Sequence, residues 1–144
     1  MVKFPLHFSV NADSKSGVRT VWTCHTGNLP KIACAIPLEF GGQGDGYSPE
    51  DFFAISILNC LIATFKVYAD MAKVQYSEIS GLAKATLNKH PSDSVLWVSD
   101  LEITLDVKGA SDKDKAKTLL DKAIKDCAVS NSIKSGKSFH LKVS

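Results

Sequence analysis

Apolar residues alternate with other residues along the first third of the chain, a pattern typical of β-strands. The first alternating run covers residues 4–10, and Pro5 within this run indicates a strand at the edge of a sheet. Two more strands are predicted at residues 18–24 and 31–38. The segment 25–30 between them contains glycine and proline and has the length of a hairpin connection, so these two strands are expected to pair.

A helical pattern follows a glycine-rich loop at residues 41–47. Ser48 is predicted to cap this helix, with Pro49 at its first position and Glu50 near the positive end of the helix dipole. Residues 52–72 continue the helix, and its first part is apolar on nearly all sides, which is typical of a helix buried on most sides. One small chain has few elements to cover such a helix, so the pattern predicts a homodimer.

The second half of the chain combines both patterns. Strands are predicted at residues 79–89 and 95–107, and Ser111 is predicted to cap a second helix with an apolar stripe over residues 116–127. A last strand is predicted at residues 137–143. The order is β-β-β-α-β-β-α-β. Because most connections have the length of hairpins, we expect an α+β fold with mainly antiparallel sheets around long central helices.

Composition narrows the range of functions. The chain has 144 residues, of which 44% are hydrophobic and 22% charged, and this fits a single domain over residues 1–144. Its net charge of +2 is too small to predict a nucleic-acid or anionic-membrane partner. The longest uncharged apolar run is shorter than the ~20 residues of a membrane span. The N-terminus lacks the apolar region of a secretory signal, so we expect a reducing, cytoplasmic location and free thiols.

Two cysteines lie on helices that face the core. Cys60 is in the middle of the apolar helix, and Cys127 ends the apolar stripe of the second helix. A purely structural role, as small residues of the core, explains both cysteines, because free cysteine is among the most buried residue types. If the two helices pack together, however, the two sulfur atoms could also approach bonding distance.

Arg19 and Glu50 are the charged residues that stand out. Arg19 is the only arginine in a chain with seventeen Lys and Arg residues. A guanidinium can hold a carboxylate through two hydrogen bonds and can stabilise a thiolate. Glu50, next to the glycine loop, could accept those bonds, but its place in the first helical turn is also explained by the helix dipole.

Metal and nucleotide sites are disfavoured. Cys24, His25 and Cys34 bracket the predicted hairpin, but their spacing is not that of a zinc site and a fourth ligand is not evident. The glycine loop at residues 41–47 does not match the phosphate-binding motifs of nucleotide-binding proteins. We therefore expect neither a metal nor a bound cofactor.

Several of these features together resemble the OsmC/Ohr family of thiol-dependent peroxidases. The segment GGQGDGYSPEDFFAISILNCLIATF is similar to the family's glycine-rich loop, helix start and first-cysteine helix. The segment DCAVSNSI is similar to its second-cysteine segment, and Arg19 falls where the family keeps its catalytic arginine. The separations between Glu50, Cys60 and Cys127 also agree with the family.

The resemblance implies an OsmC-like fold, an intertwined homodimer and a peroxidase reaction. Cys60 would attack a hydroperoxide, preferably an organic one, and become a sulfenic acid, which Cys127 would convert to a disulfide. An external dithiol, in some relatives a lipoylated protein, would reduce this disulfide. Arg19 would stabilise the thiolate and the departing oxygen, and Glu50 would orient Arg19.

The length of the first helix constrains how these residues meet. Glu50 and Cys60 are ten residues apart, a rise of ~15 Å along a helix, so they cannot touch across their own helix. Either the loop folds back through Arg19, or Glu50 and Arg19 come from the partner chain. We favour the partner chain, which would place two active sites at the dimer interface.

Two rival functions use the same residues. A non-catalytic dimeric module of this fold could bind a small hydrophobic ligand in an apolar groove, with Cys60 as an inert buried thiol. Fast reaction of Cys60 below neutral pH would distinguish an enzyme from this module. A disulfide reductase or isomerase is disfavoured by the absence of a CxxC motif.

Overall fold

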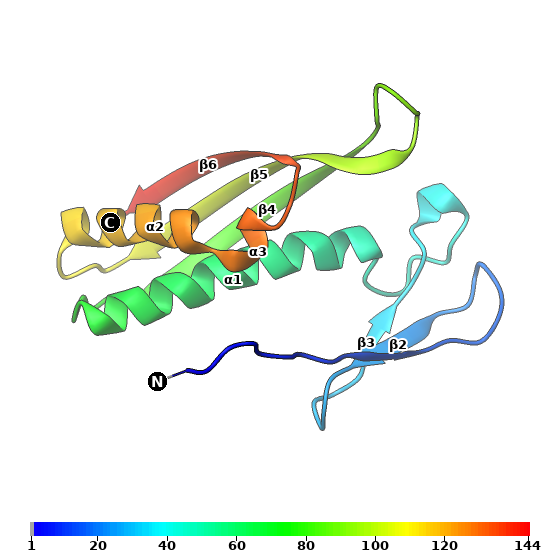
Figure 1. Ribbon diagram of the computed structural model, residues 1–144, viewed down its shortest axis with the longest axis horizontal. Coiled ribbons are helices and arrows are strands. Elements are labelled where there is room, and N and C mark those ends of the chain that lie inside the picture. The colour runs from blue at the N-terminus through cyan, green and yellow to red at the C-terminus, as the bar shows by residue number, and fades with distance from the viewer. Residues whose placement is uncertain (1) are drawn as a thin grey trace. The chain divides into compact units, whose positions relative to one another are not determined.

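The computed structural model describes residues 2–144 and has a mixed α+β architecture (Figure 1). The chain forms two compact units, one ending at Phe52 and one from Phe53 to Ser144. The predicted order of the principal elements is confirmed, with two short helices in addition. The elements are β1 (Asn11–Asp13), β2 (Trp22–His25), β3 (Ile32–Cys34), η1 (Leu38–Phe40), α1 (Pro49–Met71), β4 (Glu78–Lys89), β5 (Leu96–Lys108), α2 (Lys113–Asp126), α3 (Ala128–Asn131) and β6 (Gly136–Val143).

The first unit contains the antiparallel sheet β1-β2-β3. The prediction of a strand at residues 4–10 is wrong, because the first strand is the three-residue β1, which follows that run. The side chains of Phe4 and Phe8 are 82% and 90% exposed. Alternation makes a segment able to form a strand, but a strand also needs a neighbour for its backbone hydrogen bonds. Within residues 2–144, pairing with β2 begins only at Asn11.

The glycine loop packs tightly within the first unit. Gly41 follows η1, and its φ of 79° is the left-handed conformation that glycine adopts without strain. A Cβ atom on Gly42 would overlap the backbone carbonyl oxygen of Ile36, and one on Gly46 would lie 2.8 Å from the backbone nitrogen of Cys34. Gly42 and Gly46 are therefore needed for the close approach of two backbone segments.

Substitution of Gly42 by alanine is expected to destabilise the protein by ~3 kcal/mol, because the backbone of Ile36 must move to admit the methyl group. Gly27→Ala is the matched control. Gly27 has a φ of 50° but no atom within 4 Å of an added Cβ, so it should lose only the ~1 kcal/mol of a left-handed alanine. Urea unfolding measures both values, and equal losses would contradict the steric explanation.

The second unit is built on the sheet β4-β5-β6. β4 and β5 are antiparallel, as predicted, but β6 runs parallel to β5. The connection through α2 and α3 explains this difference, since a helical crossover returns the chain to the end of the sheet from which β5 started. In Figure 1, β6 lies beside β5 along most of its length.

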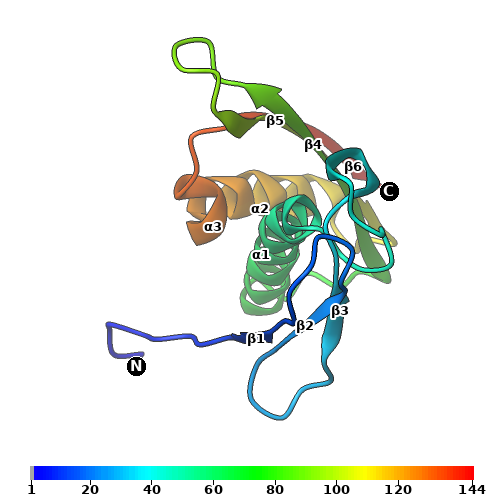
Figure 2. The same ribbon diagram turned by 90° about the vertical axis from the view of Figure 1, so that its right-hand side faces the viewer.

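Within the second unit, α1 and α2 lie on the same side of this sheet (Figure 2). The alternation predicted for β5 is confirmed, because every second residue from Leu101 to Val107 is buried against the helices. The buried core comprises Ile57, Leu61, Phe65 and Ala69 of α1, Leu101, Ile103, Leu105 and Val107 of β5, Leu120 and Ala123 of α2, and Cys127.

The predicted helix caps are right for α1 and wrong by one residue for α2. The Ser48 hydroxyl accepts the backbone N–H of Asp51 at 3.0 Å, and the Asp51 carboxylate accepts the backbone N–H of Ser48 at 2.8 Å. At α2 the cap is Asp112, whose carboxylate accepts a first-turn backbone N–H at 2.9 Å. The hydroxyl of Ser111 instead accepts the backbone N–H of Gln75 at 3.0 Å.

The burial expected for α1 on most of its sides is not reached within one chain. Ile55, Val67 and Met71 remain 38%, 56% and 71% exposed. By length and composition alone α1 could also cross a membrane, since a window of it has a mean hydropathy of 1.7. The buried residues of α1, however, belong to the same core as β5 and α2.

Candidate functional site

The second unit brings Cys60 and Cys127 together. Cys60 is half-buried in the middle of α1, and Cys127 follows the last residue of α2 and is fully buried. The two side chains are within hydrogen-bond reach of each other, and both are free thiols. The sequence left open whether these two sulfur atoms approach each other. The packing of α1 and α2 on one face of the sheet brings them together.

A hydrogen bond also joins α1 to α2 close to the two thiols. The hydroxyl of Tyr68 on α1 donates a hydrogen bond of 2.6 Å to the Asp126 carboxylate, one residue before Cys127. This bond raises the pKa of Tyr68 above its ordinary value. The ammonium of Lys122 lies 4.4 Å from the centre of the Tyr68 ring. These contacts hold the end of α2, and with it Cys127, against α1.

The surroundings of Cys127 keep its thiol protonated. Burial, followed by the hydrogen bond with Cys60, raises the pKa of Cys127 from 9.0 to about 11. A hydrogen bond of 3.4 Å from the backbone N–H of Ser130 to the Cys127 sulfur acts in the opposite direction but is weaker. At neutral pH Cys127 is therefore a poor nucleophile, and Cys60 is the more accessible sulfur.

The raised pKa of Cys127 predicts a pH dependence of stability in the reduced protein. The folded state favours the protonated thiol, so its contribution is complete below the unfolded pKa of 9.0 and is lost as the pH rises through about 11. Compared with Cys127→Ala, the wild type should lose on the order of 2 kcal/mol more over this range. Urea unfolding under reducing conditions measures the difference, and parallel pH profiles would contradict it.

The predicted charged residues both lie in the first unit. Arg19 is exposed in a turn at residues 17–20, three residues before β2. Glu50 is half-buried in the first turn of α1, and its Oε2 atom is buried. In the part of the chain that the structure describes, this oxygen accepts no hydrogen bond, and no ion pair joins Glu50 to Arg19. This carboxylate oxygen of Glu50 can therefore still accept a hydrogen bond.

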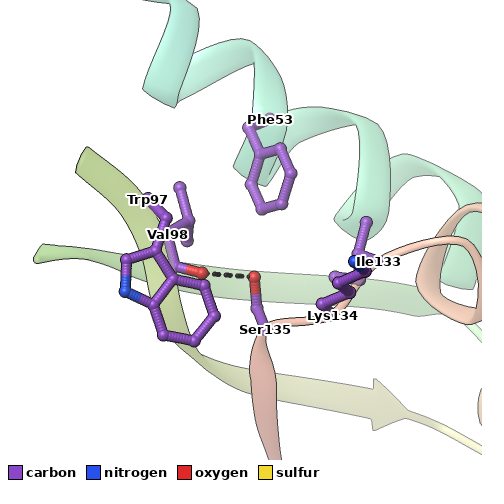
Figure 3. Close-up of a pocket in the computed structure, with 6 residues that line it drawn as sticks. All are labelled: Phe53, Trp97, Val98, Ile133, Lys134 and Ser135. Carbon is purple, nitrogen blue, oxygen red and sulfur yellow. Dashed lines mark hydrogen bonds between the residues drawn. The ribbon is translucent and has the colours of Figure 1, made fainter. Parts of the chain in front are cut away.

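A small pocket that is largely open to solvent, called the cavity below, lies in the second unit and was not foreseen from the sequence. It has a volume of about 230 Å³ and lies between α1, β5 and the segment that follows α3 (Figure 3). Its lining is mostly apolar and comprises Phe53, Trp97, Val98, Ile133, Lys134 and Ser135. The hydroxyl of Ser135 donates a 2.6 Å hydrogen bond to the carbonyl of Val98, and the buried Trp97 Nε1 has no hydrogen-bond partner within residues 2–144.

The cavity and the thiol pair share one helix face. Phe53 precedes Cys60 by seven residues, which is two turns and a rise of about 10 Å on the same side of α1. Ile133 follows Cys127 by six residues and packs against the same core. An apolar lining of this kind can hold a hydrocarbon group but supplies few polar contacts to specify one.

Cys24 and Cys34, which the sequence placed around a hairpin, also lie next to each other in the first unit. Within residues 2–144, no group of three or more His, Cys, Asp or Glu side chains is arranged to hold a metal ion.

Comparison with known proteins decides the family. The model of the OsmC-like protein family matches residues 42–142, which include both Cys60 and Cys127. This chain belongs to the OsmC-like protein family. No curated protein sequence matches it.

Solved structures of OsmC-like proteins share the fold of this family member at low sequence identity. An organic hydroperoxide resistance protein from Legionella pneumophila has 24% identity and a TM-score of 0.73, with 97% of this chain and 99% of that chain covered. An OsmC-like protein of unknown function from Vibrio cholerae has 15% identity and a TM-score of 0.79, with 95% and 99% covered. An organic hydroperoxide resistance protein from Bacillus subtilis has 19% identity and a TM-score of 0.68, with 95% and 98% covered.

Proposed function

We propose that this protein is a thiol-dependent peroxidase that reduces organic hydroperoxides. The observation that carries the proposal is the pair of free thiols, Cys60 on α1 and Cys127 at the end of α2, within reach of each other. Membership of the OsmC-like family and the organic hydroperoxide resistance proteins among the similar structures support it.

The reaction uses the two sulfurs in a fixed order. The Cys60 thiolate attacks the distal peroxide oxygen, the O–O bond breaks, and an alcohol leaves while Cys60 becomes a sulfenic acid. The Cys127 sulfur then attacks the Cys60 sulfur, which forms the disulfide and releases water. The order follows from accessibility, because Cys60 is half-buried whereas Cys127 is buried and protonated. An external dithiol, such as a lipoylated protein, restores both thiols and so closes the cycle.

The apolar cavity gives the proposal its substrate class. Its mostly hydrocarbon lining is on the face of α1 that carries Cys60, two turns away. An alkyl or aryl group bound there would place its hydroperoxide end toward the thiol pair, whereas hydrogen peroxide would gain nothing from the cavity. This difference supports a preference for organic hydroperoxides.

Arg19 and Glu50 complete the proposed site from the partner chain of a homodimer. The ten-residue separation of Glu50 and Cys60 along one helix favours this arrangement over a route within one chain. The exposed apolar side chains of α1, which include Val67 and Met71, also favour a second copy as their cover. Each Å² of this apolar surface that a second copy buries contributes ~25 cal/mol to the free energy of association.

Stopped-flow oxidation of the reduced protein tests the activity. tert-Butyl and cumene hydroperoxide should each oxidise Cys60 in a fast phase and faster than hydrogen peroxide does, and mass spectrometry should find the Cys60–Cys127 disulfide afterwards. Slow oxidation by all three peroxides would contradict the proposal. If cumene hydroperoxide then only perturbed the fluorescence of Trp97, measured in a Trp22→Phe variant that leaves Trp97 as the one tryptophan, the result would favour the alternative, a module that binds a hydrophobic ligand in the cavity.

Mixed dimers test whether the site is shared. A Cys60→Ser chain and an Arg19→Ala chain are each expected to be inactive or nearly so. After subunit exchange, each heterodimer should contain one complete site, so activity should return to ~50% of the wild type per heterodimer. Steady-state peroxide consumption measures this recovery.

Two controls separate the parts of this claim. Analytical ultracentrifugation of the wild type at micromolar concentration should find a dimer, and a folded monomer would contradict the proposed assembly. Absence of recovery in a confirmed heterodimer would contradict only the shared site. Arg19 would then have to serve Cys60 of its own chain.

A further inference from the structure

The first unit holds a second pair of cysteines that the peroxidase reaction does not use. In the antiparallel pairing of β2 with β3, Trp22 is opposite Cys34 and Cys24 is opposite Ile32. Residues directly opposite and residues two apart share one face of a sheet, so Cys24 and Cys34 are diagonal neighbours on the same face. The thiol of Cys34 is within hydrogen-bond reach of the Cys24 thiol.

The two thiols differ in accessibility. Cys24 is half-buried, whereas Cys34 is only 1% exposed and its thiol donates a 3.4 Å hydrogen bond to the carbonyl of Ile32. Burial, followed by the contact with Cys24, raises the pKa of Cys34 above its ordinary value. A reagent in solution therefore meets the Cys24 sulfur first, with the Cys34 sulfur beside it.

The strands that carry these thiols also hold the segments next to Arg19 and Glu50. Arg19 lies three residues before β2. On the other side, the backbone of Tyr47 donates to Ala33 at 2.9 Å and accepts from Ala35 at 3.1 Å, so the segment leading to Glu50 is bonded to β3 around Cys34. A covalent link between β2 and β3 would thus fasten both segments to one framework.

We propose that Cys24 and Cys34 form an intramolecular disulfide under oxidising conditions. This disulfide would link β2 to β3 covalently and so restrain the two segments that carry Arg19 and Glu50. The inference rests on the placement of the two thiols across the β2–β3 pair and is independent of the proposed reaction at Cys60. It adds a modification site to the first unit.

The oxidant is a hydroperoxide. The Cys24 thiolate attacks one peroxide oxygen, the O–O bond breaks, an alcohol leaves and Cys24 becomes a sulfenic acid. The Cys34 sulfur then attacks the Cys24 sulfur, its proton leaves with the hydroxyl group as water, and the S–S bond forms. Two electrons pass from the two thiols to one molecule of hydroperoxide, and a dithiol reductant reverses the change.

The test uses a Cys60→Ser/Cys127→Ser variant, in which Cys24 and Cys34 are the only cysteines. The reduced variant is treated with tert-butyl hydroperoxide, alkylated, and digested with trypsin, which cuts after Arg19 and Lys31 and so separates the two cysteines. We expect the peptides that contain Cys24 and Cys34 to be joined until reductant is added. Amide hydrogen exchange of β2 and β3 should slow by about tenfold in the oxidised form.

Two results of this experiment would contradict the proposed disulfide. If Cys24 stops at a sulfenic acid, trapped by dimedone, while Cys34 stays free, the proposal is wrong. Disulfides only between different chains would also overturn it. The wild type can be tested in the same way when a protease that cuts after Glu39 and Glu50 is added to trypsin, because this second cleavage separates Cys34 from Cys60. Cys34→Ser in the double-variant background should leave Cys24 to form the dimedone adduct.

Discussion

Replacing Cys60 by serine is expected to abolish turnover of organic hydroperoxides, with a loss of at least ~1000-fold in kcat/KM. A serine hydroxyl is not ionised at neutral pH and cannot become a sulfenic acid, so the first step has no substitute. Because Cys60 is half-buried and serine is close to it in size, the fold should persist. Cumene hydroperoxide consumption with a dithiol reductant measures the loss.

Cys127→Ser is the matched control for this prediction. The variant keeps Cys60 and should still consume one equivalent of hydroperoxide, because only the second step needs the Cys127 sulfur. Oxidation should stop at the sulfenic acid of Cys60, which dimedone traps, or proceed to the sulfinic acid. If Cys60→Ser were active and Cys127→Ser showed no oxidation at all, the two roles would be reversed.

Replacing Arg19 by alanine is expected to slow the reaction with peroxide by ~100-fold at neutral pH, because an oriented guanidinium stabilises both the thiolate and the departing oxygen. The pH at which the rate reaches half its maximum should move upward. Since Arg19 is exposed in a turn, the stability should change by only ~0.5 kcal/mol. Stopped-flow rates between acid and alkaline pH and urea unfolding measure the two effects.

Arg19→Lys separates charge from geometry. Lysine keeps the positive charge but cannot hold a carboxylate through two parallel hydrogen bonds, so the rate should fall between those of the wild type and Arg19→Ala. A rate–pH profile of Arg19→Ala that equals the wild type would remove Arg19 from the mechanism. A large loss of stability would instead make it a structural residue of the turn before β2.

The candidate residues could be selected from the sequence, but their arrangement could not. The segment from Ser48 onward predicts the start of α1 because the helix cap is a local exchange of hydrogen bonds between Ser48 and Asp51. The 3.6-residue period likewise places Cys127 on the apolar stripe of α2. Neither pattern specifies which helix face meets which, so contact between Cys60 and Cys127 was a conditional expectation that the structure confirms.

The cavity illustrates the same limit at longer range. Phe53, Trp97 and Ile133 come from three separate segments, and each alone is an ordinary core residue. Only the pairing of β4 with β5 and the path of the chain after α3 place these side chains around one space. A sequence signal was present in Trp97, an aromatic residue near the start of a strand, but it gave no indication of a cavity.

The sequence by itself determined the features that depend on neighbouring residues: the start of α1, the alternation of β5 and the family motif around Cys60 and Cys127. The tertiary structure decided the features that depend on distant partners. Residues 4–10 alternate but lack a neighbouring strand, β6 is parallel because α2 crosses the sheet, and Cys24 meets Cys34 because of the β2–β3 register. The physical reason is that hydrogen-bond pairing and side-chain packing join residues far apart in the chain, whereas periodicity and capping act within a few residues.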